Sequence, residues 1–217
     1  MRQLLLLMVL AGAGAACSRA PEDSRAVPAA APLPRANLTR LDRERWRAVL
    51  AWPDACESAF QTSHAADDPG LTFTTLTPGV AIVQVLCAAG AYQPSWVYVQ
   101  LDERRVPPSA SVLRFPVYET EDGTAITSTE QSEVWGEPTW SAAARELSVL
   151  NIVRQTGDCG IWTRYRLPSD DTATRPVVVE ARALLPCPAR PRERAVSADG
   201  QPPLDWTPIA PPVPKAR

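Results

Sequence analysis

Four cysteines of this chain are the residues best suited to form covalent bonds with one another: Cys56, Cys87, Cys159 and Cys187. An even number of cysteines in an exported chain is typical of disulfides. Three pairings are possible. The spacing favours Cys56–Cys87, which would join a short helix to a strand, and Cys159–Cys187, which would bracket a hairpin. A metal or redox site fits poorly, since there is no C-x-x-C motif and only one histidine. We therefore predict two disulfides, no metal and no cofactor.

Candidates for catalytic chemistry are few. The only histidine, His64, lies in a polar stretch over residues 62–68 and is expected to be an exposed loop residue. No Gly-x-Ser-x-Gly motif supplies a nucleophile for it. Clustered carboxylates could serve a hydrolase, but they fall in predicted turns, where they commonly bind the backbone; they are Glu119, Glu121, Asp122, Asp170 and Asp171. We predict no catalytic residue and keep a carboxylate-dependent envelope hydrolase as the alternative function.

The N-terminus predicts where the protein is found. Residues 4–10 are an unbroken apolar run, residues 11–16 are small, and Cys17 follows them. This pattern is typical of a signal peptide over residues 1–16 that is cleaved before a cysteine, and the apolar run is too short to span a bilayer. We expect Cys17 to carry the lipid of a bacterial lipoprotein and to anchor the chain in the membrane.

Three details bear on this anchor. Gly14 stands where lipoprotein signals usually have leucine, so cleavage after Ala15 or Ala16, giving a soluble periplasmic protein, is the alternative. Residues 17–37 are rich in Ala, Pro, Arg and Ser without apolar periodicity, which is typical of a flexible tether behind a lipidated cysteine. Ser18 favours sorting to the outer membrane, facing the periplasm.

Size and charge limit the remaining possibilities. The chain has 217 residues and a formal net charge of −2, so it lacks the basic field with which proteins bind nucleic acid. Residues 38–188 remain as one domain when the signal, the tether and a proline-rich tail over residues 189–217 are set aside. We expect Trp206 to pin this tail. No transmembrane helix is expected after the signal.

Hydrophobic patterns predict a β-rich α+β domain. A helix is expected over residues 38–50, opened by a capping box of Thr39 and Asp42, and a short helix is expected to begin with a cap formed by Asp54 and Glu57. Segments rich in Val, Thr, Tyr and Trp follow, separated by tight turns. The predicted strands are residues 71–76, 80–87, 96–101, 112–118, 147–153, 161–167 and 177–184. This pattern predicts antiparallel, sandwich-like sheets with one or two N-terminal helices and two disulfides.

Two sets of side chains could form a surface for a partner. Arg40, Arg43 and Arg47 share one face of the first predicted helix and could contact anionic lipid, but acidic residues are interleaved, so we expect a solvated helix face. Most of the seven tryptophans are expected in the core. Trp135 and Trp140 are less clearly inward, and an aromatic surface would suit a carbohydrate or a peptide.

Three segments resemble a known family. Residues 87–95 read Cys-Ala-Ala-Gly-Ala-Tyr-Gln-Pro-Ser, residues 157–165 contain the motif Gly-Asp-Cys-Gly, and residues 52–57 read Trp-Pro-Asp-Ala-Cys-Glu. Together they are similar to a bacterial cell-envelope family known as domain of unknown function 1176, over about residues 40–188. The resemblance implies a secreted, cysteine-bridged domain, and it implies no activity.

The catalytic inventory and the predicted disulfides favour binding over catalysis. Loops 90–95 and 157–158 each adjoin a predicted disulfide, and a rigid loop loses less entropy when it binds. Tyr92, Gln93 and Asp158 are therefore candidate contact residues, although ordinary turn packing beside a disulfide would use the same residue types. We expect a non-catalytic envelope lipoprotein that binds another envelope protein, a wall fragment or a wall hydrolase.

Overall fold

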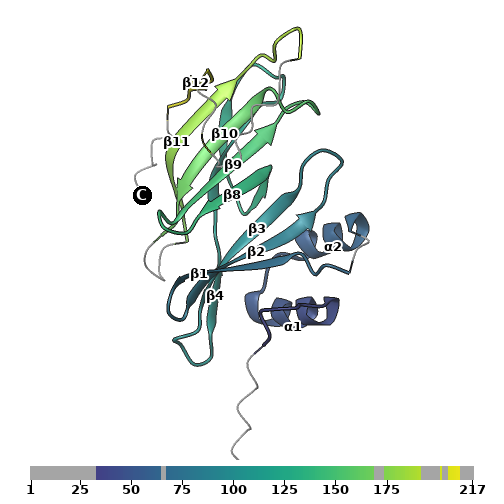
Figure 1. Ribbon diagram of the computed structural model, residues 1–217, viewed down its shortest axis with the longest axis vertical. Helices are drawn as coiled ribbons and strands as arrows, with labels where there is room; N and C mark the ends of the chain where they lie inside the picture. The colour runs from purple at the N-terminus through teal and green to yellow at the C-terminus, as the bar shows by residue number, and fades with distance from the viewer. Residues whose placement is uncertain (1–32, 65–66, 169–173, 192–200, 202–204, 211–217) are drawn as a thin grey trace, which may run out of the picture. The chain divides into compact units, whose positions relative to one another are not determined.

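Figure 1 shows the protein as a computed structural model, which describes residues 33–64, 67–168, 174–191, 201 and 205–210. The predicted signal peptide, Cys17 and most of the predicted tether lie outside the described residues, and so do Asp170 and Asp171. The chain divides into two units, residues 1–32 and residues 33–217, and the second contains all the described residues.

The first helix, α1 (Arg40–Leu50), begins where the sequence predicts. Thr39 Oγ1 accepts a hydrogen bond from the backbone N–H of Asp42, and the Asp42 carboxylate accepts one from the backbone N–H of Thr39, so the predicted capping box is present. The helix ends at Ala51, which has a positive φ of 51°. Within the described ranges, no helix is long and apolar enough to cross a membrane.

The second helix, α2 (Asp54–Ser63), begins differently from the prediction. Its N-cap is Pro53, and no side chain of the described residues makes a capping hydrogen bond there, so the predicted cap formed by Asp54 and Glu57 is wrong. Proline is tolerated at this position because the backbone N–H that it lacks would have no partner within the helix. Glu57 is buried, and its carboxylate accepts a hydrogen bond from the guanidinium of Arg43.

The first sheet has five strands: β1 (Leu71–Thr77), β2 (Val80–Ala88), β3 (Ser95–Asp102), β4 (Ser109–Val112) and β7 (Glu133–Trp135). All neighbouring strands are antiparallel. β2 and β3 form its centre, and β1 pairs with the free edge of β2. β4 pairs with the second half of β3 and β7 with its first half, which places Trp135 opposite Ser95.

The second sheet is a meander of five antiparallel strands in chain order: β8 (Glu137–Ser141), β9 (Glu146–Ile152), β10 (Gly160–Arg166), β11 (Val177–Leu184) and β12 (Thr207–Pro208). A separate hairpin consists of β5 (Phe115–Glu119) and β6 (Thr127–Gln131) and lies in sequence between β4 and β7, whereas the chain passes from the first sheet to the second between β7 and β8. In Figure 1 the helices lie beside the first sheet, and the green strands of the second sheet lie above it.

Both faces of the first sheet are buried, in agreement with the nearly continuous apolar sequence of β2. One face packs against the helices in a cluster that includes Trp46, Leu50 and Val83. The other face packs against β5 and the inner face of the second sheet in a cluster that includes Tyr98 and Tyr165. The predicted β-rich α+β class, with antiparallel sheets and N-terminal helices, is therefore confirmed.

The strand prediction needs two corrections. The single strand expected over residues 112–118 is two strands, because the chain leaves the first sheet at Leu113 and Arg114. Strands β6, β7, β8 and β12 are not predicted by the sequence. The sequence of β6, Thr-Ser-Thr-Glu-Gln, is mostly exposed and has no apolar alternation, so its extended form depends on pairing with β5.

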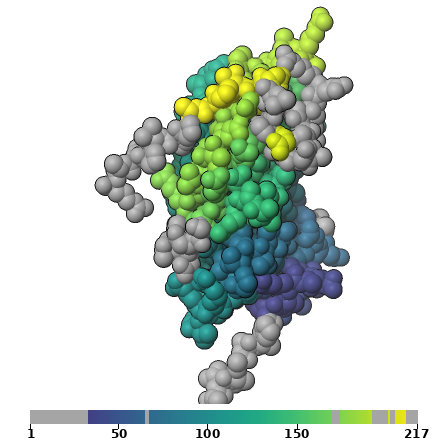
Figure 2. Space-filling view, turned by 60° about the vertical axis from the view of Figure 1, so that its left-hand side comes forward, coloured from purple at the N-terminus to yellow at the C-terminus, as the bar shows by residue number. Residues whose placement is uncertain are grey.

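The C-terminal tail packs on the outer face of the second sheet. Trp206 is buried there against Leu150, Ile152 and Trp162, and β12 pairs with β11. In Figure 2 the yellow atoms of residues 205–210 lie directly on the green and yellow-green strands. Trp206 therefore holds the tail against the second sheet, as the sequence indicates. The folded unit extends beyond residue 188.

Candidate functional site

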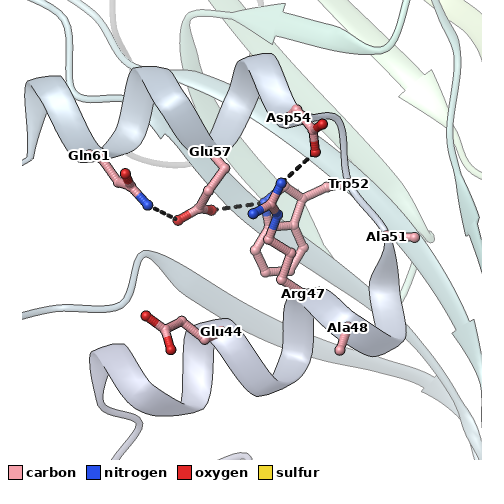
Figure 3. A pocket seen from close by; sticks show the side chains of 8 residues that line it. All are labelled: Glu44, Arg47, Ala48, Ala51, Trp52, Asp54, Glu57 and Gln61. Atoms are coloured by element: carbon pink, nitrogen blue, oxygen red, sulfur yellow. Dashed lines mark hydrogen bonds and ion pairs between the residues drawn. The ribbon is translucent and has the colours of Figure 1, made fainter.

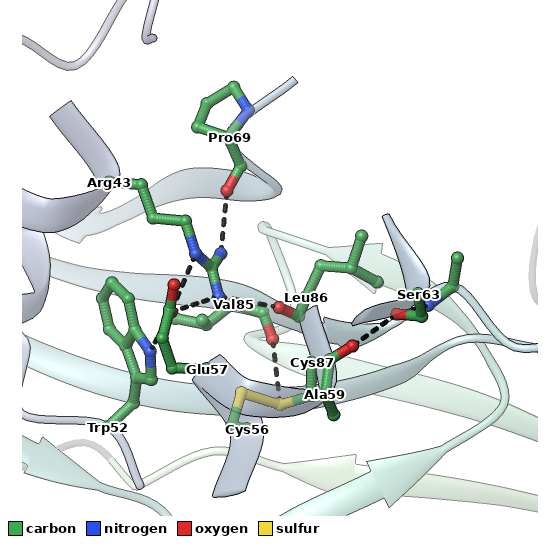
Figure 4. Close-up of a disulfide and its surroundings, with 11 residues drawn as sticks. Arg43, Trp52, Cys56, Glu57, Ala59, Ser63, Pro69, Val85, Leu86 and Cys87 are labelled. Atoms are coloured by element: carbon green, nitrogen blue, oxygen red, sulfur yellow. Dashed lines mark hydrogen bonds and ion pairs between the residues drawn. A yellow bond between two sulfur atoms is a disulfide. The ribbon is translucent and has the colours of Figure 1, made fainter. Parts of the chain in front are cut away.

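Both predicted disulfides are present. Cys56 of α2 is joined to Cys87 of β2, with Cα atoms 4.4 Å apart, and Cys159 before β10 is joined to Cys187 after β11, with Cα atoms 5.4 Å apart. Figure 4 shows the first disulfide beside the helix and the strand that it links. The second disulfide closes the end of the β10–β11 hairpin, as the spacing of the cysteines predicts.

The loop after the first disulfide is fastened to the second sheet by Gln93. The amide nitrogen of Gln93 donates to Asn151 Oδ1 at 2.9 Å, and its amide oxygen accepts from the backbone N–H of Ile152 at 2.8 Å. Gly90 makes the turn possible, because it has a φ of +63° and an added Cβ would lie 1.9 Å from the carbonyl oxygen of Gln93. Tyr92, at the tip, is 62% exposed.

The second predicted loop lies next to this one, but Asp158 does not face solvent. Its side chain is 0% exposed and forms an ion pair with Arg154, and it also accepts a hydrogen bond from the Thr156 hydroxyl. Arg154 Nη1 donates in addition to the carbonyl of Pro188, beside the second disulfide. Asp158 is thus not available as a direct contact. It holds Arg154, and its hydrogen bonds raise the pKa of that guanidinium.

A hollow surface lies beside the Tyr92 loop, where this loop meets the end of β9 and the residues after it. It consists of two adjoining hollows of about 160 and 490 Å³ that share Gln93, Trp135, Ile152 and Val153. Tyr92 and Arg154 line the smaller hollow. We call this region the aromatic cleft, because Trp135 is 41% exposed in it, and Val153 beside it is 42% exposed.

Carboxylates line the larger hollow. Glu119 and Glu121 are among its lining residues, and they belong to the run of carboxylates that could serve a hydrolase. Asp122 has the predicted turn role: it accepts hydrogen bonds from the backbone N–H groups of Ala125 and Thr124, which lower its pKa to about 2. In the described part of the chain no three His, Cys, Asp or Glu side chains are grouped so that they could hold a metal ion.

The family model described as protein of unknown function, DUF1176, matches residues 11–190. The chain belongs to this family. The match includes both disulfides and the whole aromatic cleft, whereas Trp206 and β12 lie beyond it. The comparisons with curated proteins and with solved structures found no match.

In this DUF1176 protein the prediction that His64 is an exposed loop residue is wrong. His64 follows α2 as its C-cap and is half-buried, and its ring stacks on Phe60 with ring centroids 4.8 Å apart. Its backbone carbonyl accepts a hydrogen bond from Arg40. This geometry makes His64 part of the packing between α1 and α2.

The expectation of a solvated basic face on α1 is wrong for Arg43, which is only 2% exposed (Figure 4). Arg43 Nε donates to Glu57 at 3.0 Å, Nη1 to the carbonyl of Pro69 at 2.8 Å and Nη2 to the carbonyl of Leu86 at 3.1 Å. Its guanidinium carbon lies 3.6 Å from the centroid of the Phe60 ring. One buried cation therefore joins α1, α2, β2 and the segment before β1.

A second hollow, of about 560 Å³, lies between α1 and α2 (Figure 3). Three of its charged side chains have partners within the protein: Arg47 pairs with Asp54, and Glu57 accepts hydrogen bonds from Gln61 and Arg43. Its one aromatic residue, Trp52, is buried. This groove presents fewer groups to a ligand than the aromatic cleft does.

The sequence therefore predicts only part of the cleft. Tyr92 and Gln93 line it as candidate contact residues, and Trp135 was recognised as less clearly inward. Val153 and Arg154 were missed. They lie in the turn after β9, and no pattern in the sequence distinguishes them from ordinary turn residues.

Proposed function

We propose that the protein is an exported envelope lipoprotein that binds a partner in the aromatic cleft without catalysing a reaction on it. The observation that supports this most directly is the exposure of Tyr92 and Trp135 around one hollow. Exposed aromatic side chains are characteristic of binding surfaces, because they bury a large apolar area while their polar atoms stay in water.

The construction of the cleft also supports binding. The Tyr92 loop is joined to β9 by both polar groups of the Gln93 side chain. Arg154 is held by Asp158 and by the carbonyl of Pro188. Walls that are fixed before a partner arrives lose less conformational entropy on binding, so more of the contact energy appears as affinity.

The cleft is tested by introducing a photo-crosslinking amino acid in place of Trp135, with the same substitution of Val106 as the control. Val106 is 98% exposed but lies in the turn between β3 and β4, away from the cleft. We expect a defined envelope adduct from position 135 in intact cells, and a loss of about tenfold in its yield when Tyr92→Ala is added. Thermal melting checks that Tyr92→Ala leaves the fold intact, as expected for an exposed side chain.

Two results would contradict this function. Identical adducts from positions 135 and 106 would show that the cleft has no special partner. Turnover of a wall substrate that disappears in Glu119→Gln or Glu121→Gln would favour the alternative, a carboxylate-dependent envelope hydrolase, because both carboxylates line the same hollow.

The anchor is a separate prediction. Labelled fatty acid should be incorporated into the wild-type protein and not into Cys17→Ser, and the variant should move from the membrane fraction to the soluble fraction. Cys56→Ser is the control, since it removes a cysteine that is bonded to Cys87 and should leave lipidation unchanged. Equal release of wild type and Cys17→Ser into the soluble fraction would remove the anchor from the proposal.

A further inference from the structure

The charges of the aromatic cleft do not cancel. Among the described residues that line it, the charged ones are Glu119, Glu121 and Arg154. Arg154 is already neutralised, because Asp158 forms an ion pair with it below the surface. The hydrogen bonds of Arg154 are also directed inward, from Nε to Asp158 and Thr156, from Nη1 to the carbonyl of Pro188 and from Nη2 to Asp158.

Among the described residues, no cationic side chain forms an ion pair with either of the two carboxylates. Glu119 accepts hydrogen bonds from neutral side chains, Gln131 Nε2 at 2.7 Å and Thr129 Oγ1 at 3.3 Å, which orient it without neutralising it. Glu121 is exposed. The described lining therefore carries a net negative charge and is complementary to a cation.

The aromatic side chains favour the same kind of ligand. The face of an indole or phenol ring carries a negative quadrupole, so Trp135 and Tyr92 attract a cation placed over them. Exposed Val153 offers an apolar surface beside them, which suits the methylene stem of a long basic side chain. An ammonium group at the end of an aliphatic stem matches all three features.

We propose, on the basis of the binding function above, that the cleft receives an extended segment of a protein partner through a lysine side chain of that segment. The two hollows, of about 160 and 490 Å³, have room for one long side chain and its neighbouring residues. The lysine ammonium lies over the Trp135 ring and near Glu119 and Glu121, and its stem packs on Val153.

The test uses the full mature chain in detergent and three capped, fluorescent peptides that differ only at the central residue, which is lysine, acetyl-lysine or glutamate. Fluorescence anisotropy gives the dissociation constants. We expect the lysine peptide to bind about tenfold more tightly than the acetyl-lysine peptide, since acetylation removes both the cation–π contact and the ion pair. This preference should decrease at high salt.

Matched variants identify the side chains that cause the preference for lysine over acetyl-lysine. The double variant Glu119→Gln and Glu121→Gln should bind the lysine and acetyl-lysine peptides nearly equally. The double variant Glu44→Gln and Glu103→Gln changes the net charge by the same amount outside the cleft and should keep the preference. Thermal melting of both variants controls for folding.

The outcomes separate this inference from the function on which it rests. The lysine and acetyl-lysine peptides could bind equally, with the binding of both lost in Trp135→Ala. This result would overturn the recognition of a cation but would leave the cleft as a binding site. Tighter binding of amine-bearing fragments from digested cell wall than of the capped lysine peptide would overturn the choice of a protein segment. Failure of all peptides to bind, together with identical adducts from positions 135 and 106, would contradict both the binding function of the cleft and its recognition of lysine.

Discussion

Replacing Arg43 by alanine is expected to lower the free energy of unfolding by about 3–5 kcal/mol, because it leaves a buried carboxylate without its cation. Arg43 and Glu57 are both buried, with Nη2 and Oε2 2.9 Å apart. The variant also leaves the carbonyls of Pro69 and Leu86 without this donor. Urea unfolding, followed by circular dichroism, measures the difference.

Arg45→Ala is the matched control for this prediction. Arg45 lies on the same helix, but its side chain is exposed and pairs with Asp42 at the surface, so a change of less than about 1 kcal/mol is expected. If Arg43→Ala and Arg45→Ala are equally stable, the buried guanidinium does not stabilise the junction of helices and sheet.

The same pair determines how the effect of Arg43→Ala depends on pH. Burial raises the pKa of Glu57, but the hydrogen bond and charge of Arg43 outweigh burial and hold this pKa below its ordinary value of 4.5. The stability that this depressed pKa contributes is present above pH 4.5 and is lost as the pH falls through the folded pKa. In Arg43→Ala the hydrogen bonds of Trp52 and Gln61 to Glu57 remain, but the largest opposition to burial is gone, so the pKa of Glu57 should rise and protonation should relieve its buried charge. The difference in stability between the wild type and Arg43→Ala should therefore be largest at neutral pH and smaller in acid.

Removing the second disulfide in Cys159→Ser with Cys187→Ser is expected to lower the free energy of unfolding by about 3 kcal/mol. The two cysteines are 28 residues apart in sequence, and the bond limits the unfolded chain over this length. Arg154 contacts the carbonyl of Pro188 beside the bond, so the cleft should also lose rigidity and bind its partner more weakly. Thermal melting and the crosslinking yield from position 135 measure the two effects.

Leu50→Ala separates loss of stability from loss of binding. Leu50 is buried in the cluster beneath α1, and its truncation should cost about 2–5 kcal/mol through a cavity distant from Arg154. Below its melting temperature this variant should keep the wild-type crosslinking yield, whereas the disulfide variant should not. Equal yields in both variants would show that the bond stabilises the fold without shaping the cleft.

Much of the fold follows from local sequence chemistry. Thr39 and Asp42 are three residues apart and form the capping box that this spacing predicts. β11 (Val177–Leu184) has the predicted bounds, because its valine-rich sequence favours a strand. β6 escaped prediction because its polar sequence carries no such alternation, and β5 supplies its hydrogen-bonding partner.

The candidate site follows less fully from the sequence. Tyr92 and Gln93 were identified from their place beside a cysteine, and they do line the cleft. Asp158 was identified by the same reasoning but is buried, because the charge of Arg154, four residues earlier, neutralises it inside the protein. Local spacing indicates that two such residues are near each other, but it does not indicate which of them faces solvent.

The start of α1, the spacing that favours the two disulfides and the strands with apolar sequences could all be predicted from the chain. Which side chains meet could be seen only in the folded protein. Trp135 reaches the Tyr92 loop because β7 pairs with β3, and Arg43 is buried because α1 packs across Glu57 and the end of β2. The physical reason is that burial and charge pairing depend on residues distant in sequence, so the same arginine on the same helix is a surface residue or a buried cation according to what packs over it.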